Sequence, residues 1–261
     1  MDLFWIAEVV VGFFDLRGWG GFEVAPDART ACRSRVRDSP ASSRQRSAQN
    51  GATFGNTAKA IPDDRARRQI MSDETIEVLA ISGSLRKAAF NTALLHAAQE
   101  LAPEGMSIQL YADLASIPPY DDDIRVAGYP PVVATLRDRV RAADALIFAT
   151  PEYNRSFPGV LKNAIDWVSR PPAQPLDGKP AAVMGAGPGV LGTALANYQL
   201  RQVLSVLNVH VVPGLEVLVG GAASKFDGQG RLLDQPTREF LTKSLLALMR
   251  LTKRLKYDPG L

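Results

Sequence analysis

A polar loop running from Ser84 to Asn91 is the first stretch of this sequence whose residue types could do chemistry. It carries a hydroxyl at Ser84, a guanidinium at Arg86 and a carboxamide at Asn91, and it lies between an apolar run and an amphipathic one. The remaining residues of the loop are Leu85, Lys87, Ala88, Ala89 and Phe90. Because a helix N-terminus presents free N–H groups and a favourable dipole, such a loop suits a phosphate monoester. The sequence leaves open a plainer reading, in which Ser84 or Asn91 caps the helix and Arg86 is a solvated charge.

A second polar loop begins at Pro151, after a later apolar run, and continues through Glu152, Tyr153 and Asn154. The prolines at 151 and 158 restrict the backbone, so the shape of this loop is fixed. Tyr153 and its polar neighbours could then hold a flat heteroaromatic ring by its face and edge. The alternative is an ordinary turn between a strand and a helix, with Asn154 supporting the backbone.

A third loop is rich in glycine and extends from Gly185 to Gly192, with Ala186 near its start. Its glycines also fit the pattern Gly-x-Gly-x-x-Gly, and Glu216 follows where a ribose-binding acid could stand, which would suggest a Rossmann NAD-dependent dehydrogenase. That fingerprint normally opens the first strand–helix unit, whereas this copy follows the fourth predicted strand. The dehydrogenase is therefore the weaker interpretation. A nucleoside triphosphatase is disfavoured because the sequence contains no Gly-x-x-x-x-Gly-Lys-Ser/Thr motif.

These loops are separated by short apolar runs that alternate with longer amphipathic ones. We predict strands at Ile76–Ile81, Ser107–Tyr111, Ala145–Ala149, Ala181–Met184 and Val209–Val212. We predict helices at Asn91–Leu101, Val132–Ala142, Gly159–Ser169, Thr193–Leu207 and Pro236–Leu255. This alternation is typical of a parallel sheet with helices on both faces, so we expect a flavodoxin-like three-layer αβα fold with five strands in the order 2-1-3-4-5.

Charge and cysteine content limit the kinds of function available. Of 261 residues, 30 are Lys or Arg and 27 are Asp or Glu, and residues 1–71 hold 11 of the former and 8 of the latter, which leaves 19 of each beyond. A neutral body without a basic stripe argues against nucleic-acid binding. The only cysteine is Cys32, so we expect no disulfide, thiolate nucleophile or metal site in the body. The histidines, His96 and His210, are expected to be packed or surface side chains.

Residues 1–72 form an Arg-rich N-terminal extension that we predict to be disordered, because large apolar side chains are scarce from Asp27 to Arg68. The apolar run from Phe4 to Phe14 is interrupted by Glu8 and is too short for a membrane span, and it lacks the features of a secretory signal. We therefore expect no membrane association and a cytoplasmic protein. Because the composition changes at Met71, we hypothesise that translation starts there. The alternative is a genuine N-terminal tail or an organelle-type presequence, and the acidic residues argue against the presequence. Residues 73–261 form the predicted domain.

The motifs resemble those of a known family when they are taken together. The Gly-Ser-Leu-Arg…Asn loop, followed by Pro-Glu-Tyr-Asn-x-Ser and Gly-x-Leu-Lys-Asn-Ala-Ile-Asp-Trp, is similar to the NADPH-dependent FMN reductase family, and within it to bacterial quinone and chromate reductases. The resemblance covers roughly Ile76 to Leu255. It implies that the FMN phosphate binds Ser84 through Asn91 and that the isoalloxazine ring lies against Pro151 through Asn154. Ala186 occupies the position at which the resemblance implies a serine hydroxyl near the flavin.

The resemblance implies an FMN-dependent NAD(P)H oxidoreductase. NADPH or NADH would give a hydride to FMN and leave, and a small-molecule acceptor such as a quinone, free flavin, azo dye or chromate would take its place. The flavin carries the chemistry, so no side chain need act as a catalytic acid or base. The alternatives are a flavodoxin-type electron carrier, against which the balanced charge argues, and a flavin-binding redox sensor.

The resemblance also points to a homodimer or homotetramer. The predicted helix Thr193–Leu207 carries both polar and apolar side chains on adjoining faces, which is a mixture suited to an interface. Arg201 on this helix is a candidate for pairing across subunits. An ordinary amphipathic helix packed on the sheet is the alternative.

Overall fold

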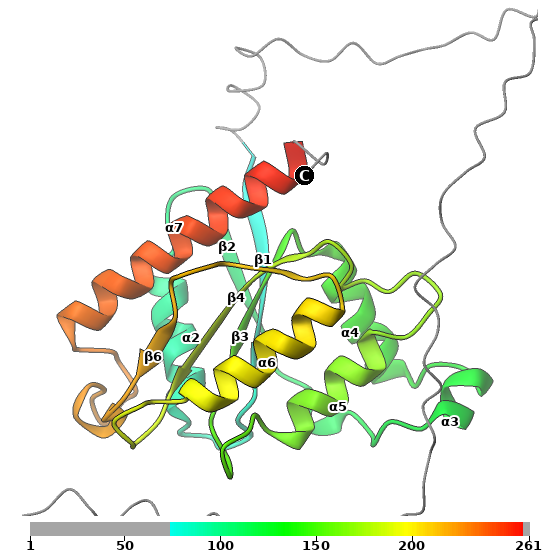
Figure 1. Cartoon of the computed structure of the whole chain (residues 1–261), viewed down its shortest axis with the longest axis horizontal. Helices are drawn as coiled ribbons and strands as arrows, with labels where there is room; N and C mark the ends of the chain where they lie inside the picture. The colour runs from blue at the N-terminus through cyan, green and yellow to red at the C-terminus, as the bar shows by residue number, and fades with distance from the viewer. Residues whose placement is uncertain (1–73, 258–261) are drawn as a thin grey trace, which may run out of the picture. The chain divides into compact units, whose positions relative to one another are not determined.

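We analysed a computed structural model, which describes residues 74–257 (Figure 1). The predictions of a disordered extension over residues 1–72 and of a start at Met71 lie outside the described residues. Within the described part, no helix is both long and apolar enough to cross a lipid bilayer.

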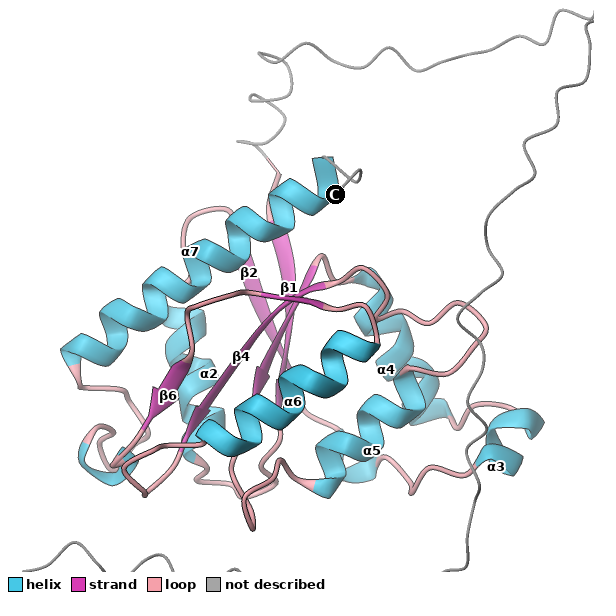
Figure 2. Cartoon of the chain, viewed as in Figure 1, coloured by secondary structure: helices cyan, strands magenta, loops and turns pink. Residues whose placement is uncertain are grey.

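A parallel sheet forms the centre of the described domain (Figure 2). Its strands are β1 (Ile76–Ser82), β2 (Met106–Tyr111), β3 (Ala145–Ala149), β4 (Pro180–Ala186), β5 (His210–Val211) and β6 (Val217–Val219). The order is β2-β1-β3-β4-β5, as predicted, and β6, which we did not predict, pairs with β4 beyond the end of β5. Because β1, β3 and β4 are adjacent, the three polar loops that follow them meet at one edge of the sheet.

Helices cover both faces of the sheet (Figure 1). They are α2 (Phe90–Glu100), α3 (Asp122–Ala127), α4 (Pro131–Ala142), α5 (Gly159–Val168), α6 (Ala194–Val206) and α7 (Gln235–Tyr257). Buried side chains of α2 and α7 form one core cluster with one face of the sheet, and those of α4, α5 and α6 form the other. The five predicted helices are confirmed. The short helix α3, which was not predicted, has no buried residue.

The sequence pattern explains this layering. All five residues of β3 and all seven of β4 are buried, because helices lie on both sides of these central strands. In α5 the buried side chains recur at helical spacing, and Trp167 is fully buried while its indole N–H donates to the Pro118 carbonyl at 2.8 Å. The core therefore holds rigid the strand ends from which the polar loops emerge.

Candidate cofactor site

A cavity of about 290 Å³ opens where the three polar loops meet. The predicted site residues that line it are Ser84, Arg86, Ala89, Phe90, Asn91, Pro151, Glu152, Tyr153 and Ala186. The predicted residues that do not line it are Leu85, Lys87, Ala88 and Asn154. The third loop adds Gly187, Pro188 and Gly192 to the lining, and the N-cap of α6 adds Thr193, all of which our predicted set lacked. The glycine pattern of the third loop was the sequence feature that could have identified these lining residues.

The N-terminus of α2 forms one end of the cavity. Its N-cap is Ala89, in extended conformation, and no side chain caps the helix. The reading in which Ser84 or Asn91 caps this helix is therefore wrong, and the N–H groups of its first turn are left without a side-chain cap. Arg86 is exposed, and its Nη2 donates to the carbonyl of Ala88 at 3.0 Å. This end of the cavity combines a helix N-terminus with a cation, which is a combination suited to a phosphate.

Asn91 is buried and joins the first loop to the third. Its Nδ2 donates to the carbonyl of Ala186 at 3.0 Å, and its Oδ1 accepts from the N–H of Ala186 at 2.9 Å. Both ends of the carboxamide are therefore engaged with the protein backbone, so the side chain positions the loops. The same contacts show that residue 186 is held through its main chain, for which an alanine is sufficient.

Glu152 joins the second loop to helix α6. Its Oε2 accepts from the N–H groups of Leu195 at 3.0 Å and Ala196 at 3.2 Å, so a carboxylate from another loop caps this helix. The N-cap residue itself, Thr193, makes no capping bond, and its fully buried hydroxyl has no hydrogen-bond partner within residues 74–257. The carboxylate of Glu152 is thus engaged in holding two walls of the cavity together.

A second link joins the same loop to the middle of α6. Ser156 Oγ donates to Gln199 Oε1 at 2.7 Å, and Gln199 Nε2 donates to the carbonyl of Arg155 at 2.9 Å. Asn154 and Arg155 have positive φ angles of 51° and 65°, so this is a tight turn that needs such support. The second loop is therefore anchored at both its start and its tip.

Strand β6 shapes the third loop. The N–H of Gly187 donates to the carbonyl of Val219 at 3.0 Å, next to the end of the strand. A Cβ on Gly220 would lie 2.2 Å from the carbonyl oxygen of Val190, so only glycine lets the loop approach this closely. Gly192 has a φ of +62°, which also favours glycine. Gly192 of this loop and Gly220 after β6 therefore allow the two segments to pack closely together.

Arg201 has partners within its own chain. Its Nε donates to Asn197 Oδ1 at 2.8 Å, its Nη1 donates to the carbonyl of Val212 at 3.0 Å, and Glu216 lies 3.6 Å away. Burial lowers the pKa of the guanidinium, and the Glu216 carboxylate opposes this shift. Our prediction that Arg201 pairs across subunits thus gains no support from its surroundings, and Glu216 contacts an arginine rather than lying beside the glycine loop as a ribose ligand would.

The sheet order and the position of the cavity define a class of protein. Strands in the order 2-1-3-4-5, with a nucleotide-sized site at the carboxyl ends of β1 and β3, are those of a flavodoxin-like FMN-binding α/β protein. This order differs from the 3-2-1-4-5-6 order of a Rossmann dehydrogenase. Residues 76–224 match the profile of the NADPH-dependent FMN reductase family, and the chain belongs to this family. The predicted fold, the FMN cofactor and the NAD(P)H donor are thereby confirmed.

Individual relatives agree with this membership. The chain is 54% identical to the NAD(P)H-dependent FMN reductase PA1204 of Pseudomonas aeruginosa over 186 residues, which cover 71% of this chain and all of that protein. It is 40% identical to a quinone reductase of Escherichia coli over 185 residues, 70% of this chain and 98% of the relative. Among solved structures it resembles FerB, a flavoenzyme NAD(P)H:(acceptor) oxidoreductase from Paracoccus denitrificans, with a TM-score of 0.64, 36% identity and coverage of 69% and 98%.

Proposed function

We propose that the protein passes electrons from NAD(P)H through FMN to small-molecule acceptors, with quinones as the foremost class and free flavin, azo dyes and chromate as further acceptors. The observation that carries the proposal is the cavity that joins Arg86 and the N-terminus of α2 to the exposed side chain of Tyr153. FMN supplies the redox chemistry there, because its ring accepts a hydride and then releases electrons to an acceptor.

The chain's own residues bind and position. Arg86 and the uncapped first turn of α2 hold the phosphate, while Pro151 and Tyr153 lie against the ring. Asn91 and Glu152 hold the three loops at fixed separation. Because the flavin carries the electron transfer, the role of these lining residues is to bind and position.

Quinones are the acceptor class that the surroundings of the cavity favour. Three apolar side chains in the loops that line it are exposed, namely Leu85, Val190 and Leu191, at 51%, 94% and 71% of their full surface. Apolar groups of this kind suit a flat, weakly polar ring better than a small oxyanion. One of the relatives named above is a quinone reductase, which supports this acceptor class.

The proposal also includes assembly: the protein forms a homodimer or homotetramer and works in the cytoplasm. On α6 the side chains of Leu195, Tyr198 and Val206 are exposed at 39%, 63% and 86%, beside the exposed Val190 and Leu191 of the third loop. Apolar side chains gathered near a site favour an interface between subunits. NAD(P)H is the soluble reductant of the cytoplasm, which is consistent with this location.

Steady-state kinetics test the proposal. The purified protein, loaded with FMN, should oxidise NADPH or NADH in the presence of a soluble quinone, with parallel lines in double-reciprocal plots because donor and acceptor use the same site in turn. Quinone reduction should stop when FMN is removed and return when it is added. Tight FMN binding without turnover of either donor would instead indicate an electron carrier.

A further inference from the structure

One hydroxyl in the wall of the cofactor cavity is buried and unpaired. The side chain of Thr193 is fully buried, and its Oγ1 has no hydrogen-bond partner in the part of the chain that the structure describes. In the same part, two other buried side-chain atoms lack a partner, Tyr111 Oη and Arg201 Nη2, and neither residue lines the cavity. A buried hydroxyl without a partner costs free energy, which a ligand that hydrogen-bonds to it would recover.

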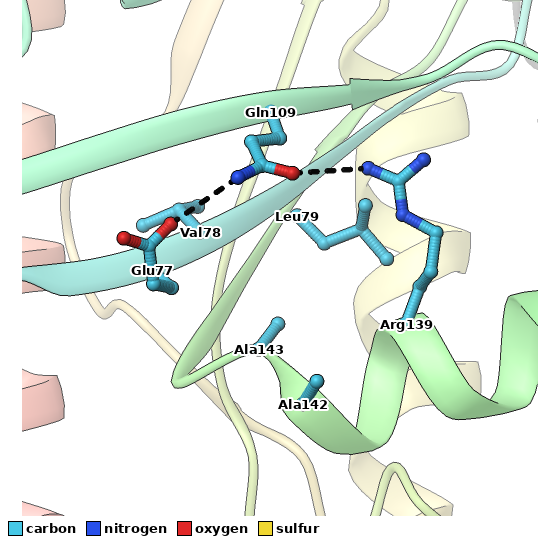
Figure 3. A pocket seen from close by; sticks show the side chains of 7 residues that line it. All are labelled: Glu77, Val78, Leu79, Gln109, Arg139, Ala142 and Ala143. Atoms are coloured by element: carbon cyan, nitrogen blue, oxygen red, sulfur yellow. Dashed lines mark hydrogen bonds between the residues drawn. The ribbon is translucent and has the colours of Figure 1, made fainter.

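Another cavity, of about 280 Å³, provides a contrast (Figure 3). It lies at the start of β1, and it shares no lining residue with the cofactor site. Its polar side chains contact one another, since Gln109 Nε2 donates to Glu77 Oε2 at 3.5 Å and Arg139 Nη2 donates to Gln109 Oε1 at 3.4 Å. These groups already have partners, so this cavity, unlike the one at Thr193, calls for no ligand.

Thr193 lies on the side of the cofactor cavity where the proposed function places the flavin ring. It directly precedes the first turn of α6, in which the N–H groups of Leu195 and Ala196 donate to Glu152 Oε2. Glu152 is the neighbour of Tyr153 in the second loop, and both line the cavity. The α6 end of this wall is therefore held against the loop that faces the ring.

The rest of this wall offers a ligand no polar side chain. Its other lining residues come from the third loop, namely Ala186, Gly187, Pro188 and Gly192. The ring of FMN carries carbonyl oxygens, ring nitrogens and an N–H along one edge, and such groups need partners when they leave water. Thr193 is the residue of this wall whose side chain can supply one.

The orientation of Thr193 shows how its hydroxyl can reach the cavity. Oγ1 faces Gly185, where a Cβ would lie only 1.8 Å from it, so glycine at 185 leaves room for the hydroxyl. Cγ2 faces Gly187, 3.5 Å from the position of a Cβ there. Gly187 lines the cavity and Gly185 does not. A rotation about the Cα–Cβ bond from one staggered rotamer to another places the hydroxyl where the methyl group now lies, on the cavity side.

We propose that the hydroxyl of Thr193 turns toward Gly187 when FMN binds and forms a hydrogen bond with the polar edge of the flavin ring. Thr193 is then a ring-binding residue, whereas Arg86 binds the phosphate. The inference rests on the placement of FMN in this cavity, which is part of the proposed function, and it is independent of the electron acceptor.

Flavin titrations of the apoprotein test the inference. Thr193→Val keeps the shape of the side chain and should weaken FMN binding about threefold to tenfold, which is the usual contribution of a neutral hydrogen bond. Riboflavin should be weakened by the same factor, because it has the same ring. Thr193→Ser keeps the hydroxyl and should retain most of the affinity for both flavins. In the flavin-free protein, Thr193→Val should leave the free energy of unfolding unchanged, because the hydroxyl has no bond to lose there.

The visible absorption spectrum of the bound flavin supplies a second readout. A hydrogen bond at the edge of the ring changes its electron distribution, so FMN bound to Thr193→Val should absorb at different wavelengths from FMN bound to the unmodified protein. FMN bound to Thr193→Ser should resemble the latter. A side chain that only fills space would leave the spectrum of the valine variant unchanged.

Thr252 of α7 provides the matched control. It is a buried threonine whose Oγ1 donates to the carbonyl of Leu248 at 2.8 Å, and it does not line the cofactor cavity. Thr252→Val should therefore leave the affinities for FMN and riboflavin unchanged.

Two results would overturn the inference. In one, Thr193→Val binds both flavins as tightly as the unmodified protein; in the other, Thr193→Ser loses as much affinity as Thr193→Val. The proposed function fails separately, if the FMN-loaded protein oxidises neither NADPH nor NADH, because the titrations require no electron donor. Loss of FMN affinity in Arg86→Ala with none in Thr193→Val would retain the placement of FMN and overturn the role of Thr193.

Discussion

Arg86 is the only cation among the described residues that line the cofactor cavity. Its guanidinium is exposed and, among the described residues, hydrogen-bonds only to the carbonyl of Ala88, so it is available to turn toward a ligand. We expect Arg86→Ala to weaken FMN binding roughly ten- to a hundredfold, because a charged hydrogen bond to phosphate contributes about 1.5–3 kcal/mol. Fluorescence titration of the apoprotein measures this change.

Riboflavin provides the control for Arg86, because it lacks the phosphate. Its affinity should be nearly the same in Arg86→Ala and in the unmodified protein. Lys at this position should restore only part of the FMN affinity, since an ammonium supplies charge without the planar fork. If both flavins were weakened equally, or neither were, Arg86 would be a solvated charge and the phosphate would lie elsewhere.

At the scale of single residues, the sequence indicated which loops form the site but not how they are held. Ser84, Arg86 and Tyr153 lie in loops whose composition suits phosphate or a ring, and all three line the cavity. The bond between Asn91 and Ala186 joins residues 95 positions apart, and no local pattern contains that information. Such partners can be identified only once the strands are side by side.

At the scale of elements, helix α6 is capped from outside its own sequence, and the two residues involved allow a matched test. Glu152→Ala should lower the free energy of unfolding by about 1–2 kcal/mol, because it removes the acceptor for two N–H groups. Thr193→Val should have an effect near zero, or stabilise slightly, because its buried hydroxyl has no partner to lose. Urea denaturation of both variants measures the difference.

Variants of Glu152 and Thr193 also distinguish the loss of a helix cap from general damage to the cavity. Glu152→Gln keeps one acceptor oxygen and should lie between Glu152→Ala and the unmodified protein in stability and in FMN affinity. A large loss of stability in Thr193→Val together with none in Glu152→Ala would show that α6 is capped by its own N-cap residue and that Glu152 serves another purpose.

The elements that the sequence did not predict are short. Strand β6 has three residues, too few for an apolar alternation to stand out, yet it fixes the glycine loop. Helix α3 has six residues and buries none of them, so it lacks the amphipathic stripe by which helices are recognised. The five longer helices and five strands were predictable because each must bury one face or both against a neighbour.

At the scale of the whole molecule, the two core clusters of the described domain draw on a continuous part of the chain. Every residue in them lies between Ile76 and Leu251, and they fill both faces of the sheet. The end of α7 is joined to the start of the domain through Lys256, whose Nζ lies 2.6 Å from Glu74 Oε1 and 3.2 Å from Asp144 Oδ1. All of these described contacts lie in a chain that begins at Met71.

A chain beginning at Met71 should consequently fold, bind FMN and assemble like the full chain. We expect its melting temperature in the FMN-bound form to agree within about 2–4 °C, which corresponds to less than about 1 kcal/mol for a domain of this size. Its FMN affinity should be unchanged, since every lining residue that the structure describes lies beyond Met71. Light scattering of both chains at micromolar concentration should give the same dimer or tetramer, because the exposed apolar side chains of α6 are present in each. A clean monomer in both chains would end the oligomer proposal. Loss of FMN binding or of the cooperative unfolding transition in the shorter chain alone would show instead that residues before Met71 belong to the folded domain.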